Sequence, residues 1–221
     1  MRRIWIRATP SIFCSGVFEG ATMHETSKSI FGKLRDARYA TRYLVGQGID
    51  IGAGRDPLGQ YHEFFPLMTG CRAWDMPDGD AQYMASVPDA QVDFVHSAHC
   101  LEHMVDPAVA LHHWLRILKP GGHLVCIVPD EDLYEQGVFP STFNSDHKWT
   151  FTMGKAASWS PVSVNLLDLL GSVRAQAQLL KLELLDATYR RHLPRLTGQA
   201  RLDQTTTPVG ECGIEFVMQK R

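Results

Sequence analysis

The feature that most constrains this chain is the run GIDIGAGRDP at residues 48–57. A short apolar segment reaches Asp50 and then turns on Gly52 and Gly54. Glycine takes positive φ angles and carries no Cβ, so such a turn brings backbone N–H groups close to a ligand. The run therefore predicts a strand of an open α/β sheet followed by a ligand-binding turn. Taken alone, it also fits a purely structural turn.

Further motifs follow this run in a fixed order. They are Asp75, Gly79-Asp80-Ala81, Phe94-Val95-His96-Ser97, Leu101-Glu102-His103 and Leu118-Lys119-Pro120-Gly121-Gly122. The series resembles the motif set of the class I S-adenosylmethionine (SAM) dependent methyltransferases, in particular the type 11-like group, and it covers roughly residues 24–221. The resemblance implies a three-layer α/β/α Rossmann-like sheet that is mostly parallel and has an antiparallel last strand, here expected at residues 214–219.

The resemblance also assigns a set of cofactor-binding residues. The glycine turn would face the methionine part of SAM. An acid after the second strand would bind the ribose, and the Gly-Asp-Ala turn would contact the adenine. The expected cofactor-binding residues are Asp50, Gly52, Ala53, Gly54, Asp75, Asp80, Ala81 and Ser97. Two alternatives stay open: Asp75 could be a helix cap or loop acid, and Asp78 could contact the adenine in place of Asp80.

The spacing after Asp75 departs from the family pattern. The family places a helix and a third strand before its Gly-Asp-Ala turn, but only Met76, Pro77 and Asp78 precede Gly79 here. A crossover connection between parallel strands takes about a dozen residues or more. The sequence therefore predicts a sheet whose third strand is reduced or missing.

Two helices are expected on periodicity and capping. Apolar or small residues recur at helical spacing through residues 24–45, namely Ile30, Leu34, Ala37, Thr41 and Leu44, and predict one amphipathic helix. Asp106-Pro107 has the form of a helix start, with an acid at the N-cap and proline in the first turn.

Composition narrows the class of protein. The chain has 221 residues, a formal charge of −2 and a sequence pI of about 6.5. No basic block suggests nucleic acid, and no run approaches the ~20 apolar residues of a membrane span. Five scattered cysteines without a CxxC pair predict reduced thiols and a cytoplasmic location. We expect a flexible arm at residues 1–22 and one methyltransferase domain at 23–221.

The acceptor side is expected in the long polar and aromatic segment at residues 129–160. Such a segment is usually functional or mobile, so a lid or an oligomer contact is the alternative, and the oligomeric state stays open. A base is useful when the acceptor is a hydroxyl or a protonated amine. The candidate bases are His147 first, then His99, with Asp130 and Glu131 behind them.

The predicted function is transfer of the SAM methyl group to O, N or C of a small-molecule acceptor by in-line displacement. One alternative is a non-catalytic SAM-binding domain that acts through a partner. Another is a nicotinamide oxidoreductase, which Pro57 disfavours because the dinucleotide turn needs a small residue there. His96, His99, Cys100 and His103 could suggest metal ligands, but the family shows Leu-Glu-His without metal, so no metal is predicted.

Overall fold

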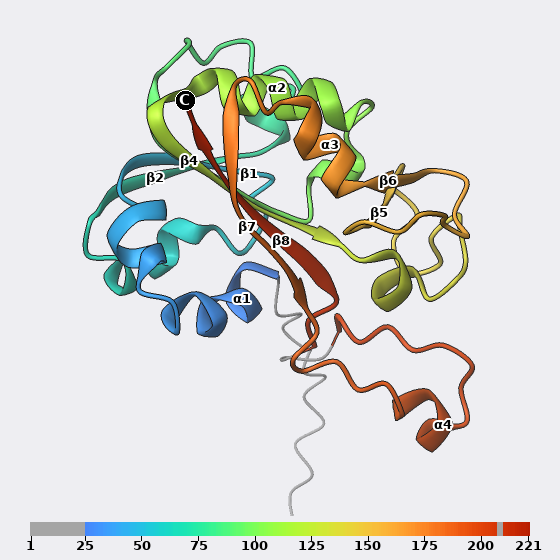
Figure 1. The fold of residues 1–221 in the computed structure, drawn as a ribbon. Helices are drawn as coiled ribbons and strands as arrows, with labels where there is room; N and C mark the ends of the chain where they lie inside the picture. Colours follow the sequence, from blue (N-terminus) through green and yellow to red (C-terminus); the bar gives the residue numbers. More distant parts are fainter. Residues whose placement is uncertain (1–24, 207–209) are drawn as a thin grey trace, which may run out of the picture.

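A six-stranded sheet runs through the centre of the protein in the order β2-β1-β3-β4-β8-β7 (Figure 1). The computed structural model describes residues 25–206 and 210–221, so the predicted arm at residues 1–22 lies outside the described residues. The strands are β1 Gly46–Ile51, β2 Met68–Trp74, β3 Val92–Ala98, β4 Leu118–Pro129, β7 Ala177–Leu185 and β8 Gly213–Lys220. The first four are parallel to one another, and β8 is antiparallel to β4 and β7, as predicted.

Helices cover both faces of the sheet. The α-helices are α1 Glu25–Leu34, α2 Pro107–Ile117, α3 Leu166–Ser172 and α4 Leu193–Thr197. Short helical turns are η1 Tyr39–Tyr43, η2 Leu58–Phe64, η3 Met76–Asp78, η4 Leu101–His103 and η5 Glu131–Glu135. Figure 1 shows α2 and α3 on one side of the sheet and α1 on the other. None of the helices in the described parts of the chain is long and apolar enough to cross a membrane.

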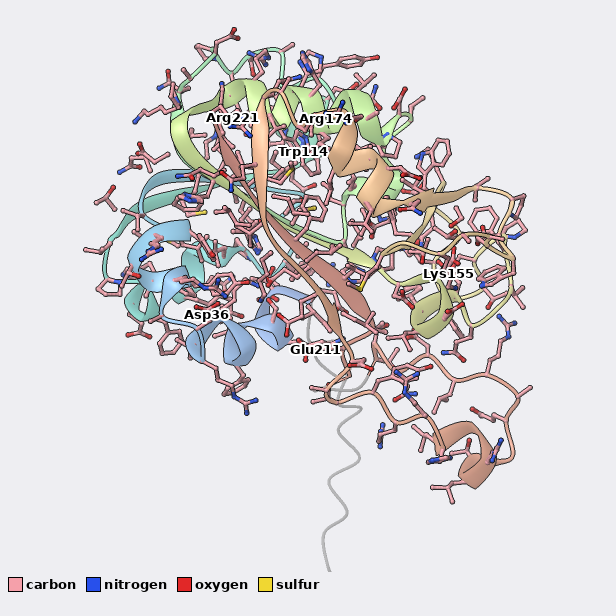
Figure 2. All side chains as sticks on the ribbon, in the orientation of Figure 1. Asp36, Trp114, Lys155, Arg174, Glu211 and Arg221 are labelled. Carbon is pink, nitrogen blue, oxygen red and sulfur yellow. The ribbon has the colours of Figure 1, made fainter. Side chains whose placement is uncertain are left out.

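Two apolar cores give the predicted three layers. Trp114 of α2 and Leu169 of α3 pack with strand residues in one core, and Figure 2 shows Trp114 at the face of the sheet beneath α2. Tyr39 and Leu58 pack with Phe94 in the other core. The N-cap prediction for α2 is confirmed, because the Asp106 carboxylate accepts from the N–H groups of the helix's first turn at 2.8 and 3.2 Å.

The reduced third strand is also confirmed. β2 is an edge of the sheet, and among the described residues no strand pairs with its outer side. After β2 the chain makes only η3 and a loop before β3 begins at Val92. The missing crossover leaves a loop at residues 79–91 where the family has a helix and a strand, and Met84 and Val87 of this loop are buried in the core.

The predicted single helix over residues 24–45 is wrong. α1 ends at Leu34, and a separate turn η1 follows at Tyr39–Tyr43. The predicted Ile30 and Leu44 are buried, but Leu34 is 46% exposed. Tyr39 and Tyr43 supply the buried side chains of η1. The two tyrosine side chains fill more of the core than Ala37 and Thr41 could. The break between α1 and η1 lets Tyr39 and Tyr43 both reach the core.

The segment after β4 folds into η5 and a small parallel pair, β5 Thr150–Thr152 and β6 Ser163–Asn165. A buried carboxylate holds it together, because Glu131 accepts from Ser158 and Ser163 at 2.8 and 2.6 Å. Lys155 lies in the same part of the molecule (Figure 2) and pairs with Glu131 at 2.8 Å. The insertion is therefore an ordered unit beside the end of β4.

Candidate functional site

A cleft of about 290 Å³ opens beyond the C-terminal ends of β1 and β3. The glycine turn after β1 forms one wall, through Gly52, Ala53 and Gly54. Ala98 and His99, at the end of β3 and just after it, form the floor beside it. In open α/β sheets ligands bind at this edge, so the cleft is the candidate functional site.

The two glycines of the turn serve different ends. Both have positive φ, +73° at Gly52 and +55° at Gly54. A Cβ on Gly52 would lie 2.6 Å from the Cys100 side chain, so that glycine permits internal packing. A Cβ on Gly54 would meet nothing closer than the Gly52 carbonyl at 4.0 Å, so the space beside Gly54 is open to the cleft.

Asp50 lies beneath this turn and is only 1% exposed. One carboxylate oxygen accepts from the Leu58 N–H at 2.6 Å, and the other lies 2.6 Å from Nδ1 of His96. Both oxygens are therefore used inside the protein, and Asp50 is not part of the cleft wall. Its geometry supports the turn from below, which is an indirect role compared with the predicted contact to a cofactor.

Asp75 lies next to the glycine turn, because the Gly52 N–H donates to the Trp74 carbonyl at 2.9 Å. Its exposed carboxylate accepts from the Met76 N–H at 2.9 Å and so caps η3. Asp75 is therefore a helix cap, which is the alternative predicted from the sequence. Capping occupies one lone pair of one oxygen, which leaves the carboxylate free to accept further hydrogen bonds.

The Gly-Asp-Ala turn lies outside the walls of the cleft. Asp80 is exposed, and its carboxylate accepts from the Gln82 N–H at 2.8 Å. The Ala81 carbonyl accepts from Nε1 of Trp114 at 2.8 Å. This turn therefore borders an open surface next to β2 rather than an enclosed pocket.

Ser97 does not reach the cleft. It is fully buried, and its hydroxyl donates to the Ile51 carbonyl at 3.0 Å, which ties β3 to β1. The next two residues, Ala98 and His99, line the cleft in its place. The sequence located the strand end correctly but chose a residue that faces the interior.

Histidines dominate the opposite wall of the cleft. His99, His103 and His147 all border it, together with Tyr134 and Asn144. The His147 ring lies 4.9 Å from the Tyr134 ring and 5.0 Å from the His103 ring, measured between centroids. Both leading candidate bases, His147 and His99, thus border one cleft.

Two buried glutamates stand behind these histidines. Nδ1 of His147 donates to Glu135 at 2.7 Å, because an ionised carboxylate can only accept. In the neutral imidazole, donation by Nδ1 leaves the lone pair of His147 on Nε2. Glu102 is fully buried, and burial raises the pKa of its carboxyl to about 7. Burial also lowers the pKa of His99 well below its usual value, which keeps that imidazole neutral.

Asp130 and Glu131 have their carboxylates engaged away from the cleft. Asp130 accepts from the N–H groups of Asp132 and Leu133, both at 3.0 Å, and caps η5. Burial raises the Asp130 pKa to about 6. Glu131 is fully buried in the network of Lys155 and the serines of the insertion. Neither residue borders the cleft, so the geometry does not favour them as bases.

Several cleft residues were not singled out from the sequence. They are Glu25, Thr26, Arg55, Asp56, Ala98, Tyr134, Asn144, Thr205 and Thr206. Tyr134 and Asn144 fall in the segment expected to form the acceptor side, so a signal existed for them. Glu25 and Thr205 reach the cleft from segments far from every motif, and no local pattern marks them.

The residues at this edge fit SAM. The open space at Gly54 admits a ligand against the backbone of the turn, and the exposed Asp75 carboxylate lies on the adjoining strand end. Hydroxyl groups of a ribose are suitable donors to such a carboxylate. The histidines on the far wall can contact a second, reacting molecule.

Comparisons with known proteins agree with this fit. A family model described as a methyltransferase domain matches residues 34–193. An uncharacterised methyltransferase of Schizosaccharomyces pombe is 34% identical over 64 residues, which is 29% of this chain and only 22% of that protein's length. The plantazolicin methyltransferase BpumL, solved with S-adenosylhomocysteine, has 14% identity and a TM-score of 0.54, covering 89% of this chain and 84% of its own.

A further solved structure is a chain from the complex between the Haloferax volcanii Trm112 methyltransferase activator and a methyltransferase. It has 16% identity and a TM-score of 0.53, and the alignment covers 87% of this chain and 88% of that one. At such identities the two solved structures establish a shared fold, while the family model carries the assignment.

Proposed function

We propose that this chain, which belongs to the methyltransferase-domain family, transfers the methyl group of SAM to a small polar molecule bound between the glycine turn and the histidine wall. The observation that carries the proposal is the cleft itself. Its volume of about 290 Å³ would have to hold the methionine part of SAM as well, which limits the acceptor to a small group. Its walls combine an open backbone turn with imidazole, phenol and amide side chains, which can orient a polar acceptor.

For the cofactor, we assign the backbone of Gly52, Ala53 and Gly54 to the methionine part of SAM. Asp75 is assigned to the ribose hydroxyls, with its capping bond kept. Asp80 and Ala81 remain the residues proposed at the adenine, on the open side of β2. Asp50 and Ser97 then act as positioning residues, because their polar groups hold the turn and the end of β3 from within the protein.

Bound SAM supplies a methyl group on a sulfonium; the acceptor atom bonds to that carbon while the carbon–sulfur bond breaks, and S-adenosylhomocysteine leaves with the electron pair. The protein's main contribution is alignment of the two molecules at a short distance, which by itself supplies a large part of the rate. The lone pair on Nε2 of His147, oriented by Glu135, is proposed to help the acceptor lose its proton.

His99 is the second residue proposed for this step. Its imidazole is neutral and borders the cleft next to Ala98. It is retained because it adjoins the strand end where the methyl group would be presented. Asp130 and Glu131 are not carried forward, since their carboxylates serve the fold of the insertion.

The proposal is tested by incubating the protein with a cell extract and SAM that carries a deuterated methyl group. Mass spectrometry should reveal a labelled small molecule that is absent without the protein. The matched variant is Gly54→Ala, whose new Cβ enters the open space of the cleft, and it should weaken SAM binding in calorimetry. Tight SAM binding with no labelled product in any extract would instead favour the non-catalytic domain that acts through a partner.

Three further predictions rest on the sequence. A cytoplasmic location is supported by free thiols at Cys71, Cys100, Cys126 and Cys212, because cytosolic thiols stay reduced. The type 11-like subgroup is supported by the motif order alone. Residues 23–221 remain the proposed extent of the domain.

A further inference from the structure

The cluster at the base of the histidine wall has the form of a cation site. Glu102, His103 and His147 each offer one ligand atom, and these atoms all lie within 4.8 Å of one another. Nε2 of His103 and Nε2 of His147 both lie 3.8 Å from Oε1 of Glu102. These gaps are too long for hydrogen bonds. Two ligands on one metal ion, each bonded at about 2.0–2.2 Å, are separated by about 3–4 Å.

The burial of Glu102 is poorly compensated, because the three neighbouring imidazoles lie beyond hydrogen-bond distance, at 3.7 to 3.8 Å from Oε1. Glu102 is 0% exposed, and neither of its oxygens has a hydrogen-bond partner among the described residues. Lys148, which follows His147 in the chain, donates to the His103 carbonyl at 2.6 Å. An unpaired buried carboxylate is costly. A metal ion between Glu102 and the two imidazoles would remove that cost.

Both imidazoles are oriented for ligation by bonds on their other nitrogen. Nδ1 of His147 donates to Glu135 at 2.7 Å. Nδ1 of His103 lies 3.0 Å from an Asp146 carboxylate oxygen and 3.1 Å from the Asp146 carbonyl. Metal-bound histidines usually donate their second N–H to a carboxylate or carbonyl in this way, which leaves the lone pair on Nε2 for the metal.

From this geometry we propose that Glu102, His103 and His147 bind a divalent transition-metal ion at the acceptor side of the cleft. Two imidazoles and a carboxylate suit zinc, cobalt, manganese or iron better than magnesium or calcium, which prefer oxygen ligands. His99 adjoins the same carboxylate, with its Nδ1 3.7 Å from Oε1 of Glu102, but it lies outside the proposed ligand set. The proposal departs from the sequence, which predicts no metal.

The role of this metal site rests on the proposed function, and the site narrows the class of acceptor. His103 and His147 border the cleft, so the open coordination positions of the ion would face the acceptor. A bound cation polarises an oxygen and lowers its pKa. The favoured acceptor is therefore a molecule with a hydroxyl group, which is methylated on oxygen. The lone pair of His147 would then act through the ion rather than as the base itself, and His99 is left to take the proton.

The test is a titration of the full chain, freed of metal by a chelator, with Co²⁺ alone. Wild type should bind one Co²⁺ per chain and gain visible absorption. Glu102→Gln should weaken Co²⁺ binding by more than about a hundredfold, and Glu135→Gln, which orients His147, by about 10- to 100-fold. His112→Gln changes an exposed histidine on α2 and should leave the affinity unchanged. Should Glu102→Gln misfold by circular dichroism, His103→Gln replaces it.

Equal Co²⁺ affinity in wild type and the cluster variants, or an equal loss in His112→Gln, would overturn the site. Because neither SAM nor acceptor is present, this outcome is independent of methyl transfer. Specific Co²⁺ binding without any methylated product would support the metal site and contradict the proposed function. Methyl transfer that persists in the metal-free protein would show that the ion is not needed to activate the acceptor.

Discussion

Two buried glutamates in this protein meet opposite surroundings. Glu215 on β8 lies 2.9 Å from both Lys33 and Lys181 and accepts from the Tyr39 hydroxyl. Although burial works against it, the charges of the two lysines lower the pKa of Glu215 to about 2. Glu102 has no such partner in the described residues, and burial raises its pKa to about 7.

The comparison indicates that Glu215 has a structural role and that Glu102 has a ligand-binding role. Around Glu215 the polar groups satisfy one another, so the cluster ties α1 and η1 to the sheet and needs nothing from outside. Around Glu102 the polar groups are oriented toward a common point but remain unpaired within the protein. A buried charge persists in a native fold only when something compensates it. The Glu102 region is therefore where a ligand is expected.

The largest expected effect is at the paired glutamate. Glu215→Gln leaves the buried Lys33 without its counter-charge, and breaking a buried pair in this way costs about 3–5 kcal/mol. The free energy of unfolding, measured with urea, should fall by that amount. Glu183→Gln is the matched control, because Glu183 also contacts Lys181 but its side chain is 51% exposed, and an exposed pair is worth about 0–1 kcal/mol.

Acid should weaken the same cluster. The pKa of Glu215 is lowered from 4.5 to about 2 in the folded protein. Its stabilisation is therefore present above pH 4.5 and is lost as the pH falls from about 4.5 to about 2. Urea unfolding at several pH values should show this acid loss in wild type and a smaller loss in Glu215→Gln. Identical pH profiles would mean that the lysines do not compensate Glu215.

Asp75 gives an intermediate effect, since its exposed carboxylate is only partly used by the cap. Asp75→Asn keeps an N-cap side chain but removes the charge proposed to hold the ribose. SAM affinity should fall by about 1.5–3 kcal/mol, or roughly ten- to a hundredfold, with little change in unfolding free energy. A loss of stability with unchanged affinity would assign Asp75 to the cap alone.

The smallest expected effect is at the unpaired glutamate. In metal-free protein, Glu102→Gln removes a buried carboxyl group whose oxygens have no hydrogen-bond partner among the described residues. Its unfolding free energy should therefore change by less than about 1 kcal/mol, far less than for Glu215→Gln. A loss of several kcal/mol would show that Glu102 is compensated in the folded protein and would break the comparison.

Local patterns were enough to predict much of the fold. The glycine turn, the Asp106 cap and the three residues between Asp75 and Gly79 each constrain the backbone within a few positions. The parallel sheet, the antiparallel last strand and the missing third strand follow from them and from the family resemblance. The helix over residues 24–45 failed because periodicity alone could not show that Tyr39 and Tyr43 would turn into the core.

The site was harder to predict because it depends on which way a side chain points. Asp50 and Ser97 occur at the expected strand ends, but both face the interior. The meeting of Glu102 with His147 joins η4 to a loop beyond η5, and no local spacing encodes that contact. The sequence could place these residues near one sheet edge, but only packing brings them to one point.

The most direct test of the account separates the two walls of the cleft in one experiment. S-adenosylhomocysteine affinity and labelled-product formation are measured for wild type, Asp75→Asn and His147→Gln. We predict that Asp75→Asn loses affinity, whereas His147→Gln keeps its affinity and forms product about a hundredfold more slowly or worse. Full product formation by His147→Gln, or cofactor affinity lost in His147→Gln and retained in Asp75→Asn, would contradict the assignment of the two walls.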